Sequence, residues 1–239
     1  VFSGDLFLVE HSAGSQTSQS FMKRMNRKNE ILAQASEQMA VMAGFTTNMP
    51  YPSEKLNNSW ELLLASQMHD ILPGTAIPSS YNLSWNDEFI AQNGFSEVLK
   101  NSLANVSSQM NTKTKGRAIT IYNPVATDRG DICTVELEYP TLPKYIKVYN
   151  TKGKEVPSQI ISRIGNKLKI IFSTQTRSLG LAVYDVRNSS SPSKLKTNTL
   201  SVSSNALENE YYKVLINNKG DIVSVFDKKL KRELLSKPA

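Results

Sequence analysis

The chain has 239 residues, of which 39% are hydrophobic and 21% are charged, a globular composition with room for two domains. The formal net charge of +7 raises the question of nucleic-acid binding. The lysines are spread out, however, and in 144–147 and 167–169 they alternate with apolar residues, as on the exposed face of strands. The single cysteine, Cys133, excludes an internal disulfide, and no apolar run approaches a membrane span. We therefore expect neither a nucleic-acid partner nor a membrane segment.

Residues 5–9 predict a short strand, and three amphipathic helices follow it. The first helix begins near Thr17 or Ser18, which are good N-caps, and ends at Gly44. Ser53 caps the second helix, and the third begins at Ser84 or Asn86, with a candidate break at Gly94. The apolar positions recur at helical spacing and are Phe21, Met25, Leu32, Ala35, Met39 and Met42, then Leu56, Trp60, Leu63 and Leu64, then Phe95, Leu99, Leu103, Val106 and Met110. Such faces with short links predict a three-helix bundle.

After residue 113 the apolar period changes to two. Val135, Leu137 and Tyr139 alternate with polar residues, which predicts a strand over 132–139. Further strands are expected over 117–123, 144–149, 159–164, 167–173 and 180–186, with a hairpin turn at Gly165-Asn166. The Ser-rich stretch 188–193 predicts a linker, and strands over 211–217 and 222–226 predict a second hairpin. The expected fold is α+β and multidomain, a three-helix bundle followed by antiparallel β-sandwich domains, the first a small sandwich or barrel.

An adjacent His69-Asp70 pair stands where the second apolar helix runs into Pro73 and Gly74. Because a proline followed by glycine is a helix stop signal, we expect the pair on the last helical turn, where the macrodipole favours a cation. Two interpretations are open. The pair is structural, with His69 capping carbonyl groups and Asp70 accepting an amide, or it is functional, with His69 as a metal ligand and Asp70 binding a substrate hydroxyl. A single histidine is not a zinc site, because zinc takes three or four ligands.

Four stretches of the sequence carry motifs that share one resemblance. The first runs from Gly14 through Thr17-Ser18 into a Lys-Arg-Met-Asn-Arg helix at 23–27, and the second is Gln67-Met-His-Asp-Ile-Leu-Pro-Gly-Thr75, preceded by Trp60. The third is Ile121-Tyr-Asn-Pro124, and the fourth combines 207–214 with 220–228. These four stretches are spread over most of the chain, and together, in the family's order, they resemble glycoside hydrolase family 38, the α-mannosidases.

The resemblance implies a retaining hydrolase of terminal α-mannosides that uses one divalent cation, usually zinc. His69 matches the last histidine of the family's metal site, and Asp70 matches the aspartate that binds sugar hydroxyls. The other ligands and the nucleophile belong to an N-terminal α/β domain that nothing here matches. We therefore expect residues 1–16 to end that domain, 17–113 to form the bundle, 114–188 a small β-sandwich, and 199–239 to begin another. This chain alone should then be inactive and should bind zinc poorly.

Glu10 falls near the family's acid/base carboxylate when counted back from Gly14 and Thr17-Ser18. A surface glutamate at a strand end is an equally good interpretation, since Ala13 stands where the family often has arginine. His11 matches no family role. The alternative function is a non-catalytic module that binds carbohydrate or protein, in which His69 is structural. Linkage preference, homo-oligomer formation and compartment stay open, although one cysteine and many lysines favour a bacterial protein, cytoplasmic or periplasmic.

Overall fold

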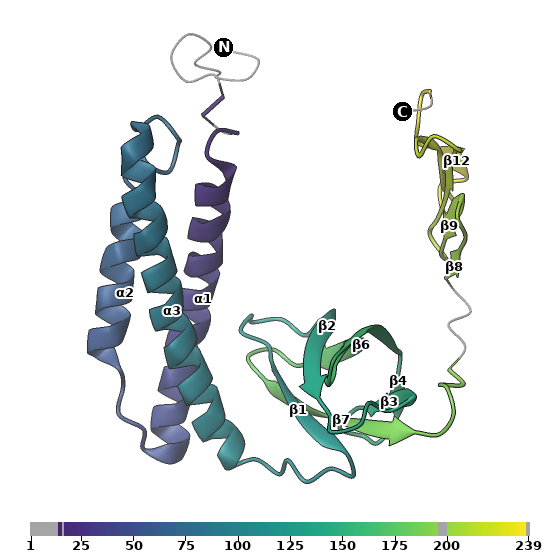
Figure 1. The fold of residues 1–239 in the computed structure, drawn as a ribbon, viewed down its shortest axis with the longest axis horizontal. Coiled ribbons are helices and arrows are strands. Elements are labelled where there is room, and N and C mark those ends of the chain that lie inside the picture. Colours follow the sequence, from purple (N-terminus) through teal and green to yellow (C-terminus); the bar gives the residue numbers. More distant parts are fainter. Residues whose placement is uncertain (1–13, 16, 196–199, 238–239) are drawn as a thin grey trace. The chain divides into compact units, whose positions relative to one another are not determined.

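The computed structural model describes residues 14–15, 17–195 and 200–237 of the chain, which divides into two compact units (Figure 1). One unit holds the described residues up to Arg129 together with Gln175–Val183, and the other holds Gly130–Thr174 with the described residues from Tyr184 onward. Three helices are followed by antiparallel sheets, so the predicted fold class is confirmed. The strand expected over residues 5–9 lies outside the described residues.

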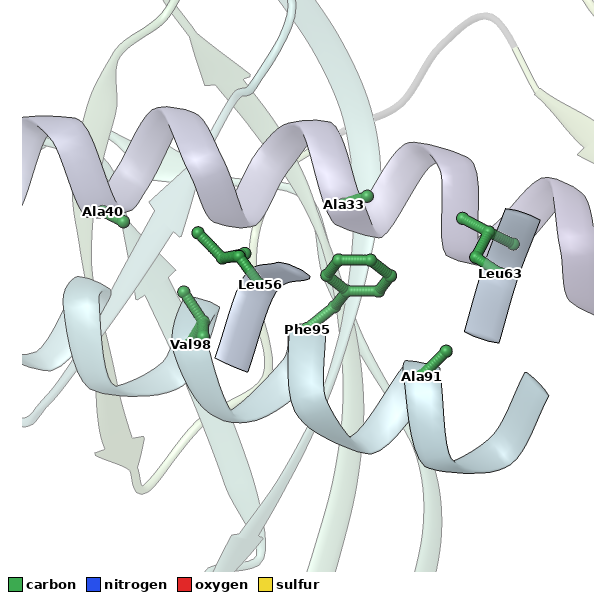
Figure 2. Packing of buried hydrophobic residues seen from close by; sticks show 7 residues of the cluster. All are labelled: Ala33, Ala40, Leu56, Leu63, Ala91, Phe95 and Val98. Carbon is green, nitrogen blue, oxygen red and sulfur yellow. The ribbon is translucent and has the colours of Figure 1, made fainter. Parts of the chain in front are cut away.

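Three helices form a bundle: α1 (Ser20–Thr47), α2 (Ser53–Ser66) and α3 (Pro78–Ser108). All three helices contact one another, and their core is a cluster of fully buried side chains (Figure 2). Phe95 of α3 lies at its centre, and its ring meets Trp60 of α2 edge-on with 5.6 Å between ring centroids. The cluster consists of Ala33, Ala40, Leu56, Leu63, Ala91, Phe95 and Val98. Small alanines facing large side chains allow this close approach of the helices.

Two predicted features of the third helix are wrong. Helix α3 begins at Pro78, six residues before Ser84, because proline suits the first helical position and Ile77 before it is extended. The helix also continues through Gly94 without a break. A Cβ at Gly94 would overlap Ser59 Oγ on α2, so this glycine permits a close helix crossing. The other helix ends differ from prediction by a few residues, and Leu64, predicted to be buried, is 57% exposed.

Strand β1 (Arg117–Tyr122) belongs to the same unit as the helices and packs on α1. The Tyr122 hydroxyl donates a hydrogen bond to Gln38 Oε1 (3.2 Å), and burial raises the Tyr122 pKa. Asn123 follows the strand, is almost fully buried, and donates to the carbonyl oxygens of Thr127 (2.8 Å) and Arg177 (3.0 Å). The asparagine of the Ile-Tyr-Asn-Pro stretch therefore ties the end of β1 to two neighbouring loops.

The predicted strands of the middle region are confirmed with small changes at their ends. They are β2 (Arg129–Glu138), β3 (Tyr145–Tyr149), β5 (Ser158–Ile164), β6 (Lys167–Thr176) and β7 (Leu181–Ser189). With the short strand β4 (Glu155–Val156), which was not predicted, and with β1 they form sheets of order β1-β7-β3-β4 and β2-β6-β5. Ile164 pairs with Lys167 across the predicted Gly165-Asn166 turn, where Gly165 has a φ of 58°. Leu137 and Tyr139 are buried, and Glu136 and Glu138, which alternate with them, are exposed, as the alternation predicts.

A separate five-stranded sheet follows, with the order β12-β11-β10-β9-β8. Its strands are β8 (Ser201–Val202), β9 (Ala206–Glu208), β10 (Tyr212–Ile216), β11 (Ile222–Asp227) and β12 (Arg232–Glu233). The predicted hairpin is the antiparallel pair β10 and β11. Hydrogen bonds from the Ser224 hydroxyl and from the amides of Leu235 and Val225 lower the pKa of Glu233 to about 2.

Candidate functional site

The His69-Asp70 pair lies in a turn beyond helix α2, not on its last turn. The helix ends at Ser66 with Gln67 as its C-cap. The predicted position of the pair on the last helical turn, where the macrodipole would favour a cation, is therefore wrong. The helix stops earlier than the Pro73-Gly74 signal implies, because consecutive turns occupy residues 67–74. The His69 Nε2 atom lies 3.2 Å from Asp70 Oδ2, and the two side chains are 83% and 57% exposed. Both side chains are therefore accessible from solvent.

The main chain at Asp70 is firmly held, although its side chain is exposed. The Asp70 carbonyl accepts hydrogen bonds from the amides of Thr75 (3.0 Å) and Ala76 (2.9 Å) and from the hydroxyl of Tyr81 (3.2 Å). Tyr81 is buried on α3, and its hydroxyl in turn accepts the Ala76 amide at 3.1 Å. The carboxylate accepts the Thr75 hydroxyl at 3.1 Å. Among the described residues His69 caps no main-chain carbonyl, so the structural interpretation of the histidine has no support in these contacts.

The start of α1 docks on the same turn from the other side. The Lys23 ammonium donates to the carbonyl oxygens of Ser18 (2.7 Å), Leu72 (3.0 Å) and Pro73 (3.0 Å), and the Ser18 hydroxyl donates to Pro73 at 2.9 Å. Gly74 has a φ of 93°, and a Cβ there would overlap the Ser18 hydroxyl. The two stretches that resemble one family at 14–27 and 67–75 are thus in direct contact.

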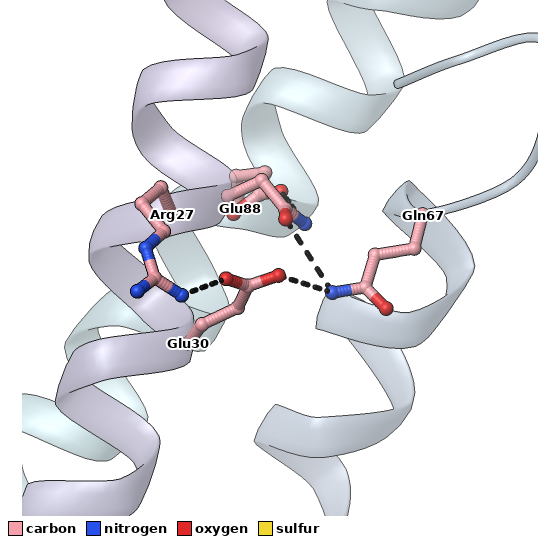
Figure 3. Close-up of polar contacts among 5 residues, drawn as sticks. Arg27, Glu30, Gln67 and Glu88 are labelled. Carbon is pink, nitrogen blue, oxygen red and sulfur yellow. Dashed lines mark hydrogen bonds and ion pairs between the residues drawn. The ribbon is translucent and has the colours of Figure 1, made fainter. Parts of the chain in front are cut away.

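A buried polar network lies behind the turn. Glu88 of α3 is fully buried, and its carboxylate accepts hydrogen bonds from Asn29 (2.6 Å) and Asn26 (3.2 Å) of α1. Gln67, two residues before His69, donates to Asn26 Oδ1 (3.4 Å) and to Glu30 (3.2 Å), as Figure 3 shows for Glu30. Glu30 also pairs with Arg27 at 2.7 Å.

Burial raises the pKa of Glu88. The two amide donors, Asn26 and Asn29, oppose this effect, and the nearby charge of Glu30 adds to it. No cation touches the Glu88 carboxylate among its described contacts, which are amides. The sequence analysis missed this residue, although the spacing of Tyr81, Glu88 and Phe95 places a glutamate on the apolar face of α3 and could have revealed it.

Metal binding at His69 requires ligands beyond the described residues. Within 14–15, 17–195 and 200–237 there is no group of three His, Cys, Asp or Glu side chains arranged to hold a metal ion. His69 and Asp70 offer one imidazole and one carboxylate, which is part of a zinc ligand set. The predicted acid/base residue Glu10, and the other histidine His11, lie outside the described residues, so their positions stay predictions. Within the described residues no helix is both long and apolar enough to cross a bilayer.

Comparison with known proteins identifies the helical region. Residues 11–106 match the family model of the α-mannosidase middle domain. An α-mannosidase of Saccharomyces cerevisiae is 35% identical over 82 residues, which is 34% of this chain and 8% of that protein. The mouse α-mannosidase 2C1 is 33% identical over 75 residues, covering 31% of this chain and 7% of the relative. The region matched by the family model, residues 11–106, contains both the 14–27 stretch and the His69-Asp70 turn.

Solved structures show the same fold over nearly the whole chain. A glycosyl hydrolase family 38 protein from Enterococcus faecalis superposes with a TM-score of 0.72 at 18% identity, over 93% of this chain and 31% of that one. An α-mannosidase from E. faecalis V583 gives a TM-score of 0.69 at 16% identity, over 92% and 29%. The chain thus spans about a third of these solved proteins and less than a tenth of the curated relatives that it matches.

Proposed function

We propose that this chain forms part of the active site of a retaining α-mannosidase of glycoside hydrolase family 38, since residues 11–106 match the α-mannosidase middle domain. In this proposal His69 is one ligand of a divalent cation, zinc, and Asp70 binds hydroxyl groups of the terminal mannose. The remaining ligands and the nucleophile come from residues beyond those described. The substrate class is an α-mannoside or an oligosaccharide that ends in one.

The exposed His69-Asp70 pair on a fixed main chain is the observation that carries the proposal. A sugar-binding carboxylate must be open to its ligand and must not shift. Asp70 combines 57% exposure with hydrogen bonds to its own carbonyl from the Thr75 and Ala76 amides and the Tyr81 hydroxyl. The imidazole of His69 has one nitrogen directed at Asp70, so the carboxylate can orient the ring while its other nitrogen binds a metal. A bound zinc ion would supply charge that grips vicinal hydroxyl groups of the sugar.

Retaining hydrolysis needs two carboxyl groups about 5–5.5 Å apart, one to attack carbon and one to protonate the leaving oxygen. Asp70 is not assigned to either role, because its place beside a metal-binding histidine suits hydroxyl binding. Glu10 stays our candidate for the proton donor. Its position relative to His69 has to come from the full-length protein.

The test is a comparison of the full-length wild-type protein with its His69→Ala variant, measuring zinc content and the rate on an aryl α-mannoside. We expect the variant to lose both, since a lost ligand weakens metal binding and removes the group that orients the sugar. Met68→Ala is a matched control on the same turn, because Met68 is exposed and carries no ligand nitrogen or carboxylate. The control should keep both properties.

Two outcomes would contradict the proposal. If His69→Ala keeps its zinc and its rate, the pair is structural, this chain is a scaffold of the enzyme, and the site assignment is wrong. If the wild-type protein shows no turnover of α-mannosides with zinc present, the reaction itself is wrong for this protein.

A further inference from the structure

We propose that Lys23 is a positioning residue that clamps the turn carrying His69 and Asp70 onto the start of helix α1. This inference rests on the proposed function, because the turn matters for catalysis only if His69 and Asp70 act on metal and substrate. It assigns a role to a lysine that lies 50 residues before Pro73, one of the three residues whose carbonyls it contacts.

The contacts of Lys23 match the donor capacity of an ammonium group. A lysine has three N–H donors, and Lys23 uses them on three carbonyl oxygens within 2.7–3.0 Å, those of Ser18, Leu72 and Pro73. Hydrogen bonds from a charged donor are stronger than neutral ones, and a half-buried position reduces competition from water. One side chain therefore joins the segment before α1 to the turn after α2.

Two further features make the contact specific. The Ser18 hydroxyl donates to Pro73 at 2.9 Å, so the same carbonyl receives both side chains. Gly74 allows the approach, because its φ of 93° and its missing Cβ are both required where Ser18 lies against it. A simple surface contact would need neither the three converging carbonyls nor a glycine of this conformation.

Lys23 and Tyr81 hold different carbonyl groups of the same turn. Tyr81 holds the carbonyl of Asp70 from α3, while Lys23 holds Leu72 and Pro73 from α1. Only a few residues separate the carbonyl held by Tyr81 from the carbonyls held by Lys23. The direction in which the Asp70 side chain points therefore depends on both contacts. Loss of the Lys23 anchor frees one end of this segment and lets His69 and Asp70 move relative to the metal and sugar.

The expected effect follows from what supporting residues contribute at metal sites. Removal of a group that orients ligands typically lowers metal affinity or activity by about 10- to 100-fold, and a misplacement of about 1 Å can cost about 100-fold in rate. For Lys23→Met we expect zinc affinity and kcat/KM to fall within that range. The side chain of methionine fills similar space but offers no donor to the carbonyls.

The experiment compares full-length wild-type protein, Lys23→Met and Lys28→Met by three measurements: hydrogen–deuterium exchange of residues 67–77, zinc affinity, and kcat and KM on an aryl α-mannoside. Lys28 lies on the same helix and is exposed, with no described hydrogen bond or ion pair, so Lys28→Met controls for the loss of a positive charge. Ser18→Ala removes one hydrogen bond from the same clamp and serves if Lys23→Met does not fold. We expect faster exchange in 67–77, weaker zinc binding and lower kcat only in the clamp variants, with a smaller effect for Ser18→Ala.

The exchange rates, zinc affinities and kcat values decide whether the Lys23 clamp exists and whether it positions His69 and Asp70. Wild-type exchange of residues 67–77 in Lys23→Met overturns the clamp, whatever the activity. Faster exchange with unchanged zinc affinity and kcat overturns the positioning role. If the wild-type protein turns over no α-mannoside, the proposed function fails, and exchange and zinc affinity then decide whether Lys23 holds the His69-Asp70 turn in place.

Discussion

Glu88 should make the stability of the helical unit depend on pH, and Glu88→Gln should remove that dependence. The folded-state pKa of this carboxyl is raised by burial above its ordinary value of 4.5. In the pH interval between these two values the folded chain binds more protons at this site than the unfolded chain. The free energy of unfolding must therefore decrease as the pH rises through that interval.

The slope of this dependence can be stated in advance. If the folded and unfolded chains differ by one bound proton, the free energy of unfolding changes by about 1.4 kcal/mol per pH unit. Below the unfolded-state pKa and above the folded-state pKa both states bind the same number of protons, and the slope is zero. The charged groups that face Glu88 are Glu30 and, through it, Arg27 on α1, and the residue that α2 contributes, Gln67, is neutral. A pH-independent offset is also expected, about 1–3 kcal/mol, because a glutamine amide would face the donor groups of Asn26 and Asn29.

The assay is urea unfolding of the 239-residue chain, followed by circular dichroism at the helical wavelength, at several pH values between about 4 and about 8. The quantity to plot is the free energy of unfolding of wild type minus that of Glu88→Gln. Glu61→Gln, which removes an exposed carboxylate on α2 with no described partner, is the control for loss of a surface charge. A difference that stays constant or increases with pH would refute the argument that desolvation dominates at Glu88.

Three further predictions concern the core, a helix crossing and the reaction. Phe95→Ala should destabilise the helical unit by about 3–5 kcal/mol in the same urea assay, since the side chain is fully buried against Trp60, and a loss below about 1 kcal/mol would contradict the packing seen here. Gly94→Ala should destabilise wild type through Ser59 Oγ, but should stabilise a Ser59→Ala background by about 0.5–1 kcal/mol, so a double-mutant cycle without coupling would argue against that contact. The isolated 239-residue chain should not hydrolyse an aryl α-mannoside, and measurable turnover would show that it needs no further domain.

Strands were predictable from this sequence because their signal is local. Leu137 and Tyr139 point inward because residues two apart share a face, and the sequence alone contains that information. The turn at Gly165-Asn166 is equally local, since a positive φ is needed within two residues. The short strands β4, β8, β9 and β12 were missed, because two or three residues carry no measurable alternation.

Helix ends and the surroundings of the site were less predictable because tertiary contacts decide them. Near the start of α3 the Tyr81 hydroxyl bonds the turn before the helix, and just beyond the end of α2 the Gln67 side chain bonds Glu30 on α1. The pair His69-Asp70 could be selected from sequence by residue type and resemblance. Its supports could not, since Lys23 and Pro73 approach one another only in the folded bundle.

The exposed side chains of His69 and Asp70 do not by themselves account for the ordered main chain of their turn. An exposed pair of this kind contributes at most about 1 kcal/mol to folding. The main chain beneath it nevertheless uses the donors of Lys23 and Tyr81 and a glycine with a positive φ at Gly74. A site that must hold a metal ligand and a sugar-binding carboxylate in fixed geometry requires ordered backbone of this kind around two solvent-facing side chains, which supports the roles proposed for His69 and Asp70.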